Sequence, residues 1–180
     1  MANFLYVDNS NVWIEGMHVS AVQSGSVPDI WTALKYKICD YNWKMDFGRL
    51  YEFAGGNQSE VGRAVLYGSR PPANDSLWSI AKGKGFEVIV HDRNVKNKEK
   101  KIDTSIAADI IADSYELMKP NADEITLVCG DQDLVPAVEK VRKRGFEVQV
   151  VFWEHASREL KEAATKFIPL NEYLDHLRLK

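Results

Sequence analysis

Six short apolar runs are the feature of this sequence that most constrains its fold. Most of them are continuous rather than alternating with polar residues, which is typical of strands covered on both faces of a sheet. The predicted strands are Phe4–Val7, Leu50–Phe53, Arg63–Tyr67, Phe86–Val90, Ile125–Cys129 and Glu147–Phe152.

Helical patterns lie between these runs. Residues 29–43 carry apolar side chains at helical spacing after the start signals Pro28 and Asp29, and Asn74 is a candidate N-cap for a helix that ends before Gly85. The other predicted helices are 103–118, 135–144 and 156–166, with a short one from residue 171. Strands that alternate with helices predict an α/β fold, a three-layer αβα sandwich with a mainly parallel sheet.

Length and composition limit the class of protein. The chain has 180 residues, 45% of them hydrophobic, which suits one domain over residues 1–180 with a short helical tail from about residue 154. A formal net charge of −3 gives no overall positive field for nucleic acid, but it leaves room for a local basic patch. We find no secretory signal, no apolar stretch of membrane-spanning length and no metal spacing of the two cysteines. These features predict a cytoplasmic protein that does not enter a membrane.

Aspartates follow several of the predicted strands. Asp8 ends the first strand, Asp131 and Asp133 follow the fifth, Asp103 begins the helix after the fourth, and Asp109 lies further along that helix. Each aspartate also has a simpler explanation, as a turn residue, a helix cap or part of an acidic helix surface that faces solvent. Because parallel strands end at one edge of a sheet, we expect these side chains to meet there, where the strand order reverses.

Carboxylates held together in one cleft repel each other, and a divalent cation removes that repulsion. Oxygen ligands without Cys or His spacing favour Mg²⁺ or Mn²⁺ over Zn²⁺, and such an ion suits phosphate chemistry. The predicted metal ligands are Asp8, Asp103, Asp109, Asp131 and Asp133.

Positively charged residues are predicted near the same edge. The loop between the fourth strand and the next helix is rich in lysine, although such charge runs are usually solvated connections. The candidate phosphate contacts are Arg93, Lys96, Lys98, Lys100 and Lys101 in this loop, with Arg70 and the hydroxyl of Ser69 after the third strand. Trp13, Trp78 and Trp153 are candidates for stacking on bases, although tryptophans are more often part of the core.

Three segments together resemble the NYN domain family: "FLYVDNSN" (4–11), "KKIDTSIAADI" (100–110) and "ITLVCGDQDLVPAVEKVRKRGFEVQVV" (125–151). The resemblance covers about residues 3–153 and implies a PIN-like, Rossmann-like fold with metal-dependent ribonuclease activity. The family's acidic motifs match Asp8 and Asn11, Asp103 and Asp109, and Asp131 and Asp133. Cys129 stands where the family often has Ser, and Leu134 where it often has Phe, and we interpret both as packing changes.

The resemblance implies the role of each residue in RNA hydrolysis. Asp8, Asp103 and Asp131 would be the main ligands, directly or through water, and Asp133 and Asp109 would complete or orient the set. Asn11 would position a water, a ligand or the substrate, and no histidine is required as general base. The predicted catalytic residues are Asp8, Asn11, Asp103, Asp131 and Asp133.

Two other functions stay open at this point. The same edge of the sheet is suited to a non-catalytic module that binds RNA, a nucleotide or a protein partner. A phosphotransfer enzyme with Asp8 as nucleophile is less favoured, because Ser10 occupies the position of the usual second aspartate. Assembly into a homo-oligomer is also open.

Overall fold

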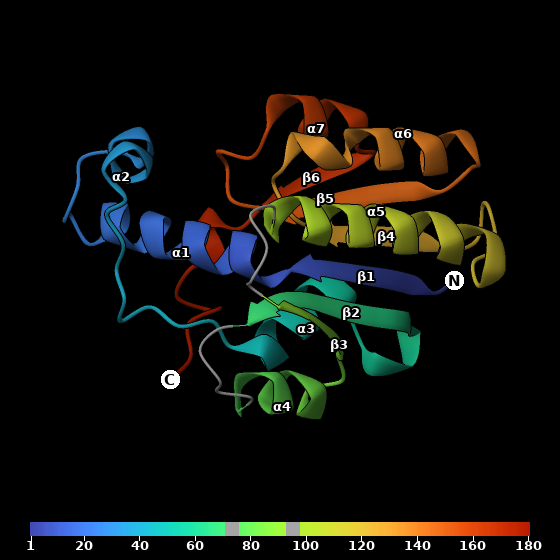
Figure 1. Cartoon of the computed structure of the whole chain (residues 1–180), viewed down its shortest axis with the longest axis horizontal. Coiled ribbons are helices and arrows are strands. Elements are labelled where there is room, and N and C mark those ends of the chain that lie inside the picture. Colours follow the sequence, from blue (N-terminus) through green and yellow to red (C-terminus); the bar gives the residue numbers. More distant parts are fainter. Residues whose placement is uncertain (71–75, 93–97) are drawn as a thin grey trace.

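The computed structural model describes residues 1–70, 76–92 and 98–180, apart from the side chains of residues 70, 92 and 98–100. It confirms the α/β prediction, with a six-stranded sheet in the order β3-β2-β1-β4-β5-β6 in which every neighbouring pair is parallel (Figure 1). The strands are β1 (Asn3–Asp8), β2 (Val61–Arg70), β3 (Glu87–Asp92), β4 (Glu124–Val128), β5 (Glu147–Phe152) and β6 (Lys166–Pro169). The chain moves outward from β1 to β3 and then returns to β4, so the strand order reverses between β1 and β4.

Helices form the two outer layers of the sandwich (Figure 1). One face of the sheet is covered by α3 (Phe47–Gly55) and α4 (Ser76–Gly83). The other is covered by α5 (Lys98–Glu116), α6 (Val135–Lys143) and α7 (Arg158–Ala163). From the end of β1, α1 (Asn9–Gln23) extends beyond the carboxyl edge of the sheet, and α2 (Ile30–Tyr36) lies beside it.

Burial explains why the strands appear as continuous apolar runs. All six residues of β1 are buried, and so are the last four residues of β4. Both strands are central in the sheet and covered by helices on both faces, so neither face selects polar residues. Within the described part of the chain, no helix is both long and apolar enough to cross a membrane.

The predicted strand Leu50–Phe53 is wrong, because these residues lie in α3. The Asp46 carboxylate caps this helix by accepting hydrogen bonds from Gly48 N at 2.9 Å and Arg49 N at 3.1 Å. The buried side chains of α3 include Phe47, Leu50, Tyr51 and Ala54, which follow helical spacing. A run of four residues, three of them apolar, does not distinguish a strand from a helix until its flanking residues are considered.

Several element boundaries also differ from the predictions. The helix predicted over 29–43 ends at Tyr36, where Lys37 adopts a left-handed conformation with φ 53°. The tail predicted to be helical from about residue 154 is helical in α7, but it also contains β6, which pairs with β5, and the short 3-10 turn η3 (Asn171–Tyr173). The N-cap predicted at residue 74 lies outside the described residues.

Candidate functional site

The first candidate ligand, Asp8, lies where β1 passes into α1. It is the last residue of β1 and the N-cap of α1, and its Oδ1 accepts a hydrogen bond from Asn11 N at 3.1 Å. The residue is only 7% exposed. The cap explanation is therefore correct for Asp8, and it holds the carboxylate at the edge of the sheet where the strand order reverses.

Asp103 reaches the same edge from α5. The predicted N-cap role is wrong, because α5 begins at Lys98 and Asp103 lies in its second turn, 7% exposed. One carboxylate oxygen of Asp103 is within 4.8 Å of one of Asp8, and these two acids form a group with Cys129. A second group, within the same distance, joins Asp103 to Asp131 and Asp133. Acids from three distant segments thus meet in space.

The loop after β4 presents Asp131 and Asp133. Asp131 caps the short helix η2 (Gln132–Leu134), where its Oδ1 accepts a hydrogen bond from Asp133 N at 2.9 Å. Asn11 Oδ1 accepts a hydrogen bond from Gly130 N at 3.0 Å, so Asn11 ties α1 to this loop. A Cβ atom at Gly130 would lie 2.3 Å from the Phe152 ring, which explains the glycine. Asn11 therefore positions the loop that carries Asp131.

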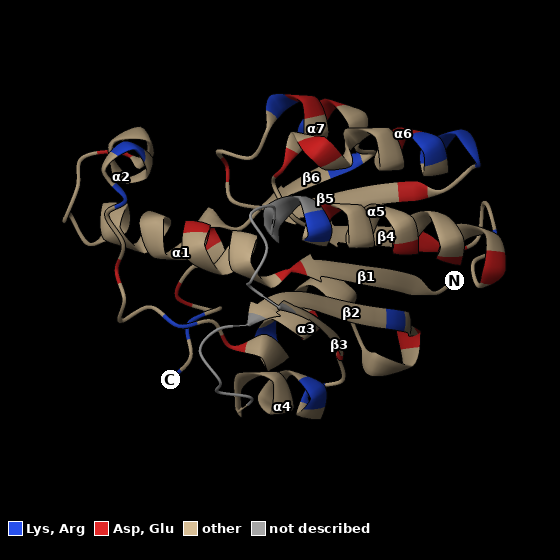
Figure 2. Cartoon of the chain, in the orientation of Figure 1, with Lys and Arg blue, Asp and Glu red and all other residues tan. Residues whose placement is uncertain are grey.

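A cleft of about 310 Å³ opens over these carboxylates, at the end of β1 where Figure 2 shows acidic residues. Its lining residues are Asp8, Ser10, Asn11, Ile14, Glu15, Ile102, Asp103 and Asp131. Glu15 was not identified from the sequence, and its Oε2 lies 2.7 Å from Nε2 of His155. Glu15 follows Asn11 by four residues, which places both on one face of a helix. This relation can be used only once residues 9–23 are known to form a helix.

Asp109 belongs to neither carboxylate group. Its Oδ2 accepts a hydrogen bond from the Tyr67 hydroxyl at 2.5 Å. One turn later, Asp113 Oδ2 accepts hydrogen bonds from the Tyr6 hydroxyl and from Arg63 Nη1, both at 2.6 Å. The acidic surface of α5 thus faces the sheet, and the explanation of a solvent-facing surface is wrong. Burial, and then the neighbouring aspartate, raise the pKa of both tyrosines, so that their hydroxyls stay protonated and donate.

Cys129 closes the buried side of the site. It is fully buried, and its Sγ lies 3.4 Å from Oδ1 of Asn11. Burial and then the negative charge of Asp8 raise the pKa of the thiol well above its ordinary value. A protonated thiol is a poor ligand for a hard cation, so Cys129 acts as the small buried residue that the sequence indicated.

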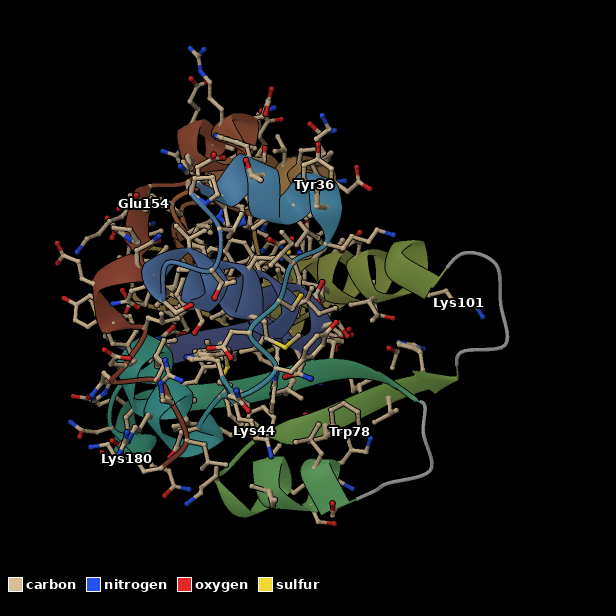
Figure 3. All side chains as sticks on the ribbon, turned by 90° about the vertical axis from the view of Figure 1, so that its left-hand side faces the viewer. Tyr36, Lys44, Trp78, Lys101, Glu154 and Lys180 are labelled. Atoms are coloured by element: carbon tan, nitrogen blue, oxygen red, sulfur yellow. The ribbon has the colours of Figure 1, made fainter. Side chains whose placement is uncertain are left out.

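The predicted substrate contacts are described only in part. Lys101 is exposed at the start of α5 (Figure 3), and Ser69 is half-buried near the end of β2. The remaining candidates lie outside the described residues or side chains, namely Arg70, Arg93, Lys96, Lys98 and Lys100.

The three tryptophans predicted to stack on bases all contribute to the core. Trp153 is fully buried, and Trp13 and Trp78 are partly buried and pack against the core. Trp31, which the sequence analysis did not single out, is 66% exposed. It is the most exposed tryptophan of the chain.

The donor set fits a hard divalent cation. Apart from the protonated thiol, the clustered donors are carboxylate oxygens in two groups that share Asp103. Asp8 is buried at one end of the site, whereas at the other end Asp131 is half-buried and Asp133 is exposed. Such an arrangement leaves the exposed side open for water and phosphate.

Comparisons with known proteins show the family and support the fold. The sequence profile of the NYN domain matches residues 10–171. A crystal structure of a protein of unknown function from Vibrio parahaemolyticus has a TM-score of 0.66 and 22% sequence identity, covering 94% of this chain and 92% of that chain, and this likeness shows the fold alone. No curated protein is significantly similar to this chain in sequence. NYN domains have a PIN-like nuclease fold and are generally nucleases, and this chain belongs to the NYN domain family.

Proposed function

We propose that this protein is a ribonuclease that hydrolyses RNA phosphodiester bonds with Mg²⁺ or Mn²⁺ held by Asp8, Asp103, Asp131 and Asp133. The observation that carries the proposal is the approach of carboxylate oxygens from three distant segments to within 4.8 Å, in two groups that share Asp103. The family and the cleft over these oxygens support it. Asp109, which is engaged by Tyr67, is not part of the proposed ligand set.

When bound, the ion would supply an activated water and stabilise negative charge on the phosphate. Asp8 and Asp103, both 7% exposed, would hold the ion at the buried end of the site, where a low dielectric strengthens their attraction to a cation. Asp131 and Asp133 bind from the exposed side, where the substrate enters. Asn11 keeps Asp131 in place through its hydrogen bond to Gly130 N. Lys101 stands exposed at the start of the same helix as Asp103, and we propose that it contacts the RNA backbone.

The test is cleavage of RNA by the wild type and by Asp8→Asn and Asp131→Asn. Asparagine keeps the helix-capping hydrogen bond at both positions, so the fold should persist while the charge is lost. We expect cleavage by the wild type with Mn²⁺ or Mg²⁺, and no cleavage after addition of EDTA or by either variant. Asp175→Asn, at a side chain that is 75% exposed, is the matched control and should cleave normally.

Full activity of Asp8→Asn would remove that residue from the mechanism. RNA binding without cleavage in the presence of either ion would instead favour a non-catalytic RNA-binding module. A mixed outcome, in which only Asp131→Asn is active, would restrict the ligand set to the buried acids.

A further inference from the structure

Exposed aromatic and basic residues gather on α2 and the residue that follows it. Trp31 is 66% exposed and Tyr36 is 64% exposed, and Lys35 and Lys37 are also exposed. We call these four residues the α2 surface. Three of the five large exposed aromatic side chains in the described part of the chain lie between residues 31 and 41. Neither the two carboxylate groups nor the core accounts for this concentration of exposed aromatic side chains.

The α2 surface continues into the cleft through a chain of contacts. The rings of Trp31 and His155 lie 6.5 Å apart at an interplanar angle of 77°. His155 Nε2 is 2.7 Å from Oε2 of Glu15, which lines the cleft with Asp8 and Asp131. In Figure 1 α2 lies beside α1 at the carboxyl edge, and Figure 3 shows Tyr36 on α2 from the side of this edge.

The packing of α2 holds these side chains outward. Ala33 is fully buried against Ala21 and Val27, which anchors one side of α2 on α1. At the start of the helix, the Asp29 carboxylate accepts hydrogen bonds from Thr32 N at 2.9 Å and from its hydroxyl at 2.8 Å. The exposed side of α2 is thus presented by a capped and anchored element.

We propose that the α2 surface binds single-stranded RNA next to the phosphate that is cleaved, an inference that rests on the proposed function. An exposed indole offers a face on which an unpaired base stacks, whereas bases in a duplex are not free to do so. Lys35 and Lys37 supply charge for neighbouring phosphates, and Lys35 Nζ lies 5.3 Å from the centre of the Tyr36 ring. The acidic cleft itself has no attraction for a polyanion until a cation binds. A separate basic and aromatic surface beside the cleft would therefore supply the attraction for RNA that the cleft itself lacks.

Binding is measured with a short unstructured RNA in EDTA, where cleavage does not occur. We expect the RNA to quench the fluorescence of Trp31, and Trp31→Ala to weaken binding by roughly 5- to 100-fold, as stacking of one base implies. Trp31→Phe should retain most of the affinity. Lys35→Ala should weaken binding and make the slope of log affinity against log salt concentration shallower by about 0.7, the value for one phosphate of a single strand. Lys143→Ala changes an exposed lysine in the last turn of α6 and is the matched control, with no expected effect.

A small phosphodiester, bis(p-nitrophenyl) phosphate, separates this inference from the proposed function, because it has a phosphodiester bond but no neighbouring nucleotides to bind the α2 surface. With Mn²⁺, Trp31→Ala should lose a larger fraction of its activity on RNA than on this small substrate. If the wild type hydrolyses neither substrate but Trp31→Ala still weakens RNA binding, the nuclease proposal fails and the α2 surface remains a binding site for single-stranded RNA. Unchanged RNA affinity and RNA cleavage in Trp31→Ala and Lys35→Ala overturn the inference. Duplex RNA that binds the α2 surface as tightly as the single strand overturns it as well.

Discussion

Replacing Asp103 by Asn removes one negative charge from the carboxylate cluster and nearly preserves the size of the side chain. Asp103 belongs to both carboxylate groups, and it is only 7% exposed. Two unit charges 4.8 Å apart repel by about 3.5 kcal/mol at an effective dielectric constant of about 20. A neutral amide accepts weaker hydrogen bonds than a carboxylate does, which offsets part of this gain. We therefore expect Asp103→Asn to raise the free energy of unfolding of the metal-free protein by about 1–3 kcal/mol, or Tm by about 2–12 °C.

The assay is thermal unfolding in EDTA and in increasing Mn²⁺. Because the ion binds the folded state, it should stabilise the wild type by about 2.7 kcal/mol at a concentration 100 times its Kd, and the variant by much less. The variant should therefore be the more stable protein in EDTA and lose that advantage as Mn²⁺ is added. Asp175→Asn should follow the wild type in both conditions. The reasoning is refuted if Asp103→Asn lowers Tm in EDTA and if both proteins respond equally to Mn²⁺.

Three further predictions concern the structure around the site. Tyr6→Phe removes a donor to the buried Asp113 carboxylate and should lower the free energy of unfolding by about 1–3 kcal/mol in urea denaturation, whereas an unchanged midpoint would show that this bond adds nothing. Gly130→Ala places a methyl group 2.3 Å from the ring of the last residue of β5, so both Tm and the metal-dependent stabilisation should fall, and a variant that keeps both would contradict the packing argument. The hydrogen bond from Arg63 lowers the pKa of Glu87 below 4.5, so the folded state binds fewer protons than the unfolded state. This stabilisation is present above about pH 4.5 and is lost as pH falls through the folded-state pKa. Since the Glu87 side chain is 50% exposed, this stabilisation amounts to less than about 1 kcal/mol. Glu87→Gln should reduce the loss of stability at acidic pH by that amount, and identical pH profiles of the two proteins would contradict the prediction.

The sequence predicted strands most reliably where helices cover both faces of the sheet. The central strands β1 and β4 were identified because both of their faces are covered, so most of their positions are buried and select apolar residues. The same pattern identified β5 through its last three residues. The same criterion failed at Leu50–Phe53, where a short apolar run belongs to a helix that starts at a polar cap. It also missed β6, which lies at the edge of the sheet and has no fully buried position.

The candidate site was predictable to the extent that its acids follow strands. Asp8 and Asp131 end or follow central strands, so parallel topology alone brings them to one edge. Asp103 and Asp109 lie on a helix, and the sequence could not show that only the first of them turns toward that edge. The direction of a helical side chain depends on how the helix rotates against the sheet, which long-range packing decides.

By itself the sequence determined the alternation of helices with five of the six strands, the mainly parallel sheet and the acidic chemistry of its edge. These properties follow from local periodicity and residue type, which can be observed in short windows of the sequence. Only the tertiary structure decided that α5 begins before Asp103, that Glu15 joins the cleft and that Trp31 stays exposed. Each of these depends on contacts between segments far apart in the chain. The free energies of such contacts cannot be inferred from a short window of the sequence.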